Sequence, residues 1–131
     1  MSKIEFGKVQ LKIMKVLWQK KRSTAMEITT TLNETMNIAH SSVQTHLRDL
    51  EKKGAVGHEK SARSFVFFPL VEAENVTQHA VKEFVHSVFS GSAEDMVSFI
   101  IKNNYLSRSE LKKIQLLLEK SRRDNAESTA P

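Results

Sequence analysis

The stretch Ser41–Lys53, with the sequence SSVQTHLRDLEKK, decides how the rest of this chain is interpreted. In a helix its apolar residues Val43, Leu47 and Leu50 fall on one side, at the i, i+4, i+7 spacing of a buried stripe. The opposite side is short, polar and net basic: it carries Ser41, Thr45, Arg48 and Lys52, flanked by Ser42, Gln44 and Asp49. Hydroxyl, amide and guanidinium groups are those that hydrogen-bond to base edges and phosphates in a DNA major groove. The alternative is the solvated face of an ordinary surface helix, so the flanking sequence has to decide.

The residues before this stretch predict two more helices. The first runs from about Gly7 to Lys20, and Trp18 lies on its apolar stripe, which is more typical of a core residue than of a base-stacking platform. Thr24-Ala-Met-Glu27 has the form of a capping box, so a second helix should start there and run to about Met36.

A short connection, Asn37 to His40, should lead from the second helix into the third. Ser41 and Gln44 stand in capping-box spacing at the start of the third helix, with Ser42 as an alternative cap. Two short helices joined by a short turn, the second with a polar outer face, are in helix-turn-helix order.

The residues after the third helix predict a β-hairpin. Gly54 follows the helix as a C′ glycine should, and two β-type runs come next, Ala55–Glu59 and Ser64–Phe68. Lys60 and Arg63 would lie at the polar tip between the runs. A hairpin in this position is the wing of a winged-helix domain, where these two cations would contact the phosphate backbone. An ordinary exposed turn is the alternative for either residue alone.

The chain beyond Pro69 is predicted to be helical and rich in large apolar residues. Helices are expected over about Glu74–Phe89, after a cap at Ser92, and after a capping box at Ser107–Glu110. Three short helices make a very small core, so their apolar surface should be buried against a second copy of the chain. The residues expected in this dimer interface are Val81, Phe84, Val85, Val88, Phe89, Met96, Ile100, Leu111, Ile114 and Leu118.

The predicted fold is therefore mainly α with a small β-hairpin wing. We expect a winged helix-turn-helix domain at residues 1–72, a helical dimerisation domain at 73–123 and a flexible tail at 124–131. Charge supports the division: residues 1–72 hold 12 Lys and Arg against 7 Asp and Glu, whereas residues 73–131 hold 8 of each. A basic first part joined to a neutral second part indicates a polyanion-binding half.

Composition argues against several other classes of protein. The chain has 131 residues and no cysteine, which excludes disulfides, thiolate metal sites and a cysteine nucleophile. His79 and His86 lie two turns apart on one predicted helix, too far apart to share a metal ion, and no phosphate loop or catalytic motif is present. We expect neither a cofactor nor a metal, and no enzyme activity. No apolar run reaches the length of a membrane span and the start lacks a signal-peptide core, so a cytoplasmic location is expected.

These motifs together resemble the penicillinase-repressor family of bacterial winged-helix regulators, which includes β-lactamase, methicillin-resistance and copper-responsive repressors. The resemblance is carried by MKVLW (14–18), TAMEI (24–28), SSVQTHLRDLEKKGAV (41–56), RSFVFFPLV (63–71) and FSGSAEDMV (89–97), in the family's order. It implies a homodimer that represses transcription at a double-stranded DNA operator with dyad symmetry.

The chain departs from the family pattern at three places. The family's recognition helix commonly reads Thr-Val-Arg-Thr where this chain has Ser42-Val43-Gln44-Thr45, and an arginine is common where Asp49 stands. Both changes put the operator sequence in doubt. In β-lactam-responsive members a sensor protease cuts an Asn-Phe bond, and that bond aligns with Phe99-Ile100 here. Because the asparagine is missing, we expect release from DNA by another signal or by a regulatory protease of different specificity.

Two other functions compete with a dimeric, sequence-specific DNA-binding repressor. The domain could serve as a protein-interaction module without a DNA role. Alternatively, a repressor could bind a small effector in its helical half, although no polar cluster within that apolar stripe marks a site. The charge asymmetry and the polar face of the third helix favour the DNA-binding repressor.

Overall fold

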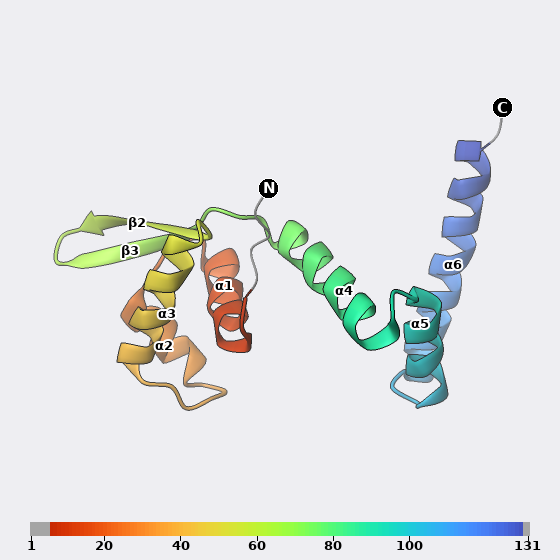
Figure 1. Ribbon diagram of the computed structural model, residues 1–131, viewed down its shortest axis with the longest axis horizontal. Helices are drawn as coiled ribbons and strands as arrows, with labels where there is room; N and C mark the ends of the chain where they lie inside the picture. The colour runs from red at the N-terminus through yellow and green to blue at the C-terminus, as the bar shows by residue number, and fades with distance from the viewer. Residues whose placement is uncertain (1–5, 130–131) are drawn as a thin grey trace. The chain divides into compact units, whose positions relative to one another are not determined.

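The computed structural model describes the backbone of residues 6–129 and the side chains of residues 6–126. Its elements, shown in Figure 1, are α1 (Lys8–Lys20), β1 (Ser23–Thr24), α2 (Ala25–Leu32), α3 (His40–Lys52), β2 (Val56–Ser61), β3 (Ser64–Pro69), α4 (Ala73–Phe89), α5 (Ala93–Lys102) and α6 (Arg108–Thr129). The chain divides into two compact units, Met1–Val81 and Lys82–Pro131, so the division falls within α4 rather than before it. The assignment of one part to DNA and the other to dimerisation stays a prediction. No helix in the described chain is both long and apolar enough to cross a bilayer.

Local capping chemistry explains the start of α2, and an asparagine explains its end. The predicted capping box is confirmed: the Glu27 N–H donates to Thr24 Oγ1 (3.1 Å) and the Thr24 N–H donates to Glu27 Oε1 (3.0 Å). These hydrogen bonds lower the pKa of the Glu27 carboxyl, and the bond from the Thr24 backbone has the larger effect. The expected end at Met36 is wrong. Asn33 stops the helix after Leu32, because its amide donates to the Ile38 carbonyl (3.0 Å) and accepts from the Ile38 N–H (3.0 Å), which closes a loop.

The recognition helix α3 starts two residues earlier than the predicted cap at Ser41 would place it. Its N-cap is Ala39, which makes no side-chain cap, so the expected roles of Ser41 and Ser42 as caps are wrong. Both hydroxyls lie within the first turn instead, where they point outward. The C-terminus follows the prediction: Gly54 has φ 81°, and the Ala55 N–H bonds to the Leu50 carbonyl at 2.9 Å, which is a Schellman ending.

The sheet has three antiparallel strands in the order β1-β3-β2, one more than the predicted hairpin. The additional strand β1 pairs Ser23 with Phe67 and Thr24 with Val66. The hairpin itself is longer and its turn tighter than expected. Lys60 pairs with Phe65 inside the ladder, and the turn consists of Ala62 and Arg63, with Ala62 at φ 54°.

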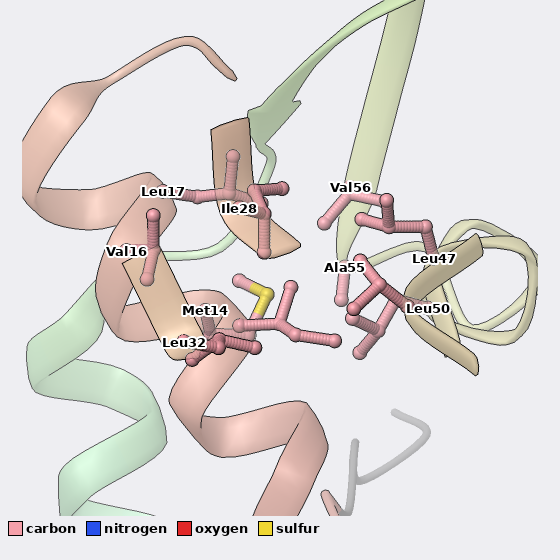
Figure 2. Close-up of a cluster of buried hydrophobic side chains, with 11 residues drawn as sticks. Met14, Val16, Leu17, Ile28, Leu32, Leu47, Leu50, Ala55 and Val56 are labelled. Atoms are coloured by element: carbon pink, nitrogen blue, oxygen red, sulfur yellow. The ribbon is translucent and has the colours of Figure 1, made fainter. Parts of the chain in front are cut away.

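One hydrophobic core holds α1, α2, α3 and the base of the sheet together (Figure 2). Its buried members are Ile13, Met14, Val16, Leu17, Ile28, Leu32, Val43, Leu47, Leu50, Ala55 and Val56. Full burial of such a side chain contributes about 1.5–3 kcal/mol, so this cluster dominates the stability of the unit. Trp18 packs against the core and donates from Nε1 to the Val71 carbonyl (2.9 Å), which confirms it as a packing residue and ties the chain before α4 to α1.

The second unit consists of well-capped helices. The Ser92 hydroxyl accepts from the Asp95 N–H (3.1 Å), and Ser107 and Glu110 form the predicted capping box (3.0 and 3.1 Å). The predicted end of α4 is also confirmed, since Gly91 adopts φ 88°. The flexible tail was expected at residues 124–131. Residues 124–129 instead continue α6 as helix, with no glycine or proline to interrupt it, and residues 130–131 lie outside the described residues.

Candidate nucleic-acid interface

The outer face of α3 is polar and exposed along its whole length. We call it the reading face and define it as Ser41, Ser42, Gln44, Thr45, Arg48 and Lys52, all of which are exposed. The opposite side, Val43, Leu47 and Leu50, is completely buried. The predicted periodicity is thereby confirmed. The Thr45 hydroxyl donates to the Ser41 carbonyl (3.0 Å), so its oxygen can still accept a hydrogen bond from a ligand.

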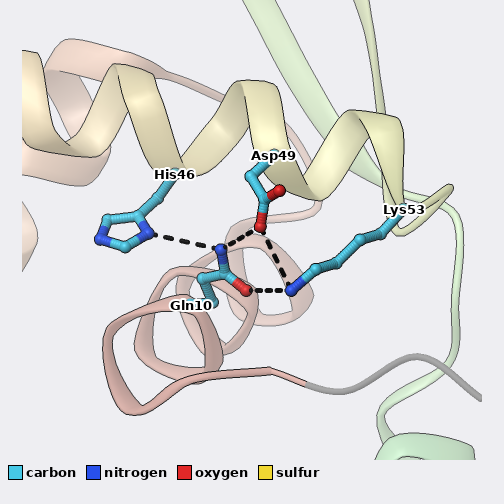
Figure 3. A network of polar contacts seen from close by, with 4 residues as sticks. All are labelled: Gln10, His46, Asp49 and Lys53. Carbon is cyan, nitrogen blue, oxygen red and sulfur yellow. Dashed lines mark hydrogen bonds and ion pairs between the residues drawn. The ribbon is translucent and has the colours of Figure 1, made fainter.

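A polar network between α1 and α3 fixes how the recognition helix is oriented (Figure 3). The buried Gln10 donates from Nε2 to Asp49 Oδ2 (2.7 Å) and accepts at Oε1 from Lys53 Nζ (2.8 Å). Lys53 Nζ also pairs with Asp49 Oδ2 (3.2 Å), and His46 Nδ1 lies 3.4 Å from Gln10 Nε2. The hydrogen bond from Gln10, followed by that from Lys53, lowers the pKa of the Asp49 carboxyl.

This network changes the interpretation of Asp49. We expected Asp49 to lie on or beside the outer face of α3, where a change of residue would alter the operator sequence. The carboxylate instead bonds Gln10 on α1, so its nearest role is to position α3. Ser42 and Gln44 are the departures from the family pattern that lie on the reading face.

The inner face of the hairpin continues toward α3. Direct pairing places His58 opposite Phe67 and Lys60 opposite Phe65, on the same face as the buried Val56. His58 Nδ1 contacts Glu51 of α3, and its ring lies 5.0 Å from that of Phe65. This contact joins the wing to the recognition helix.

The predicted wing cations occupy different positions. Arg63 lies in the two-residue turn and Lys60 in strand β2, and both side chains are exposed. A groove of about 690 Å³ between α3 and the sheet is lined by Arg63 together with Gln44 and Arg48 of the reading face. Three of the eight predicted DNA-binding residues thus meet at one groove, and Lys60 is not among its lining residues.

Sequence reasoning missed the residues that hold the reading face in place. Gln10 was one of them, although it had a signal: it lies at i relative to Met14 at i+4 and Leu17 at i+7, so a polar amide occupies the apolar stripe of α1. The contact between His58 and Glu51 carried no such signal, because it joins a helix to a strand. Among the described side chains, those of residues 6–126, no cluster of His, Asp and Glu could hold a metal ion.

The expected dimer residues fall into three groups by exposure. Val81, Phe84, Val88, Leu111 and Leu118 are exposed; Phe89, Met96, Ile100 and Ile114 are half-buried. Val85 is 9% exposed, so most of its apolar surface is already covered within one chain, and its place in the interface stays a prediction. Exposed apolar residues that the sequence analysis did not include are Val97, Phe99, Ile101, Tyr105, Leu116 and Leu117.

A three-helix unit with a three-stranded sheet, a polar reading face and a wing defines the class of winged helix-turn-helix proteins. The sequence matches the family described as penicillinase repressor over residues 6–120, and the chain belongs to that family.

Individual relatives and solved structures agree with this assignment. The chain is 29% identical to the penicillinase repressor of Bacillus licheniformis, over 91% of this chain and 94% of that protein. It is 23% identical to the methicillin resistance regulatory protein MecI of Mammaliicoccus sciuri, over 88% and 94% respectively. The DNA-binding domain of the repressor BlaI is similar in structure (TM-score 0.51, 33% identity, 57% of this chain and 93% of that one). A MarR mutant from E. coli shares the fold (TM-score 0.54, 17% identity, 89% and 78%).

Proposed function

We propose that this protein is a dimeric, sequence-specific transcriptional repressor that binds a dyad-symmetric DNA operator in the bacterial cytoplasm and catalyses no reaction. The observation that carries the proposal is the exposed reading face of α3, mounted on three buried residues in a chain of the penicillinase repressor family. An α-helix of this kind fits the major groove, where its side chains reach base edges.

The reading face and the wing would contribute different contacts. Arg48 and Thr45 would read bases, since a guanidinium can bond a guanine edge in bidentate fashion and a hydroxyl can bond any base. Lys60 and Arg63 would contact DNA phosphates beside the major groove. Within the described chain neither Arg48 nor Arg63 forms an ion pair, so both charges are available to DNA.

The apolar surface of the C-terminal unit supports the dimer. Phe84 and Val88 on α4 and Leu118 on α6 are more than half exposed, and such a surface is costly in water. A second copy would bury the same surface twice about a two-fold axis. Two reading faces related by that axis would match an operator whose half-sites repeat with the same symmetry.

The test is a gel shift with random genomic DNA fragments, followed by sequencing of the retained fragments. We expect a small set of fragments that share an inverted repeat. Retention of every fragment with equal affinity would contradict sequence-specific binding. Absence of any shift would favour the protein-interaction module, the competing function considered from the sequence.

A further inference from the structure

The groove between α3 and the wing has a composition that phosphate binding alone does not explain. Its volume of about 690 Å³ lies within the range of small-molecule sites. Thr24, Ala25, Met26, His40, Gln44, Arg48, Glu51, His58, Arg63, Ser64, Phe65 and Phe67 line it. A polyanion requires cations and hydrogen-bond donors, whereas this lining also presents apolar surface.

The apolar part of the lining is exposed to solvent in the single chain. Met26 is 57% exposed and Phe65 is 52% exposed, while Phe67 is half-buried at the edge of the core. Before α4, the large apolar side chains that the described structure leaves exposed are Met26, Phe65 and Leu70, and two of these three line the groove. Exposed apolar side chains that converge on one concavity indicate a ligand with an apolar body.

The charge of the lining selects the sign of that ligand. Arg48 and Arg63 carry permanent positive charge and form no ion pair among the described residues. Glu51 is the one carboxylate among the described residues that line the groove, and it contacts His58. The groove therefore combines an aromatic wall with two unpaired guanidinium groups, which bind carboxylates through paired hydrogen bonds.

We propose that this groove binds a small aromatic carboxylate, with the ring against Phe65, Phe67 and Met26 and the carboxylate at Arg48 and Arg63. The second half of the proposal rests on the proposed function: because Arg48 and Arg63 would serve both ligands, the carboxylate and DNA exclude each other. Binding would release the repressor from DNA at the recognition surface itself, without a change in the C-terminal unit.

The first experiment titrates 2-naphthoate into the DNA-free, full-length protein by isothermal titration calorimetry. We expect saturable binding of one molecule per chain. The cation 2-naphthylmethylammonium, which has a similar ring system and the opposite charge, and acetate, which lacks the ring, should show no measurable binding. Failure of naphthoate to bind, or equal binding of the cation, would overturn the proposal.

Matched variants locate the site. Met26→Ala removes apolar wall and should weaken naphthoate binding about five- to tenfold. Leu70→Ala removes an equally exposed apolar side chain outside the groove and should leave naphthoate affinity unchanged. If the two variants have the same effect, naphthoate binds elsewhere and the proposed site is wrong.

Competition is tested separately with a DNA fragment that the protein retains in the gel shift. With naphthoate at ten times its dissociation constant, exclusive binding should weaken apparent DNA affinity about tenfold, and DNA should weaken naphthoate binding in return. Unchanged DNA affinity at saturating naphthoate would overturn the exclusion. If naphthoate binds as expected and no DNA fragment is retained, the proposed function fails while the carboxylate site stands.

Discussion

The two units of this chain differ in how much of their apolar side-chain surface is buried within a single chain. In the N-terminal unit, eleven apolar residues from three helices and the sheet form a closed cluster. In the C-terminal unit, Val85 is the one buried apolar side chain among the described residues, at 9% exposure, and apolar side chains on α4, α5 and α6 remain exposed. We therefore expect the first unit to fold on its own core and the second to complete its core only when another molecule covers its exposed apolar side chains.

The largest effect should come from removing the apolar surface of the C-terminal unit. Replacing both Phe84 and Val88 with Asp should give monomers, because charged carboxylates cannot be buried unpaired in an interface. Operator affinity should then fall about 100-fold or more, because the second half-site is no longer bound by a linked partner. Sedimentation and gel shift measure both effects. A wild-type protein that sediments as a monomer at micromolar concentration would contradict the inference that the C-terminal unit buries its apolar surface in a dimer.

A matched pair of leucines tests the difference between a closed and an open core. Leu47→Ala should destabilise the N-terminal unit by about 2–5 kcal/mol, since Leu47 is completely buried. Leu116→Ala should leave the unfolding of that unit unchanged, because Leu116 is 62% exposed on α6. Chemical denaturation followed by tryptophan fluorescence measures both. Equal destabilisation by the two substitutions would contradict the assignment of separate cores.

Two arginines of the N-terminal unit should differ in how they affect DNA binding. Arg48→Ala should make the free energy of operator binding less favourable by about 1–3 kcal/mol and relax the sequence preference at one base position. Arg63→Ala should weaken binding to all sequences and lower the slope of log affinity against log salt by roughly one. Competition assays over a salt series separate the two patterns. A change in sequence preference without a change in salt slope for Arg63→Ala would refute the wing assignment.

Acid should affect the two units through carboxylates with lowered pKa values, Asp49 in one and Glu110 in the other. A lowered folded pKa means that the stabilising effect of Asp49 is present above its usual value of 3.8 and is lost as pH falls through the folded value. Asp49→Asn should therefore flatten the acid dependence of stability in the N-terminal unit, and should weaken DNA binding slightly at neutral pH.

Glu110→Gln is the control for this substitution, because glutamine can still complete a capping box. It should leave DNA binding unchanged. A pH profile of the N-terminal unit that is identical for wild type and Asp49→Asn would show that the Gln10–Asp49–Lys53 network contributes nothing to stability.

The smallest effect is expected in cells exposed to a β-lactam, where we predict that the protein is not cleaved. The bond that aligns with the family's cleavage site, Phe99-Ile100, lies inside α5, so a protease would first have to open that helix. A protease that selects asparagine would also leave a polar group unpaired against Phe99, at a cost of about 1–3 kcal/mol. Immunoblots should show the full-length protein, and a discrete fragment ending at Phe99 would refute this.

The elements that were predictable from sequence were those set by local chemistry. Each of these elements depends on residues within a few positions of one another. They are the buried stripe of α3, the capping boxes at Thr24 and Ser107, and the glycine ends at Gly54 and Gly91. Their outcome required no knowledge of the rest of the fold.

The features that were missed depend on residues far apart in the chain. Strand β1 exists because Ser23 and Thr24 meet Phe67 and Val66, and two residues carry no period of their own. Asp49 was misplaced because its partner Gln10 is 39 positions away. The end of α2 was missed for a different reason: Asn33 offered a loop closure that competed with helix propensity over 33–36.

The chain contains a single tryptophan and a single tyrosine, and the fold gives one to each unit. Trp18 packs against the N-terminal core with its indole N–H on the Val71 carbonyl, whereas Tyr105 is 69% exposed in the C-terminal unit and stacks on Phe99. Indole emission should therefore report the loss of the N-terminal core, and phenol emission should report the covering of the C-terminal apolar surface. The protein is thus equipped with two intrinsic optical probes, which allow assembly and unfolding to be followed separately without an introduced label.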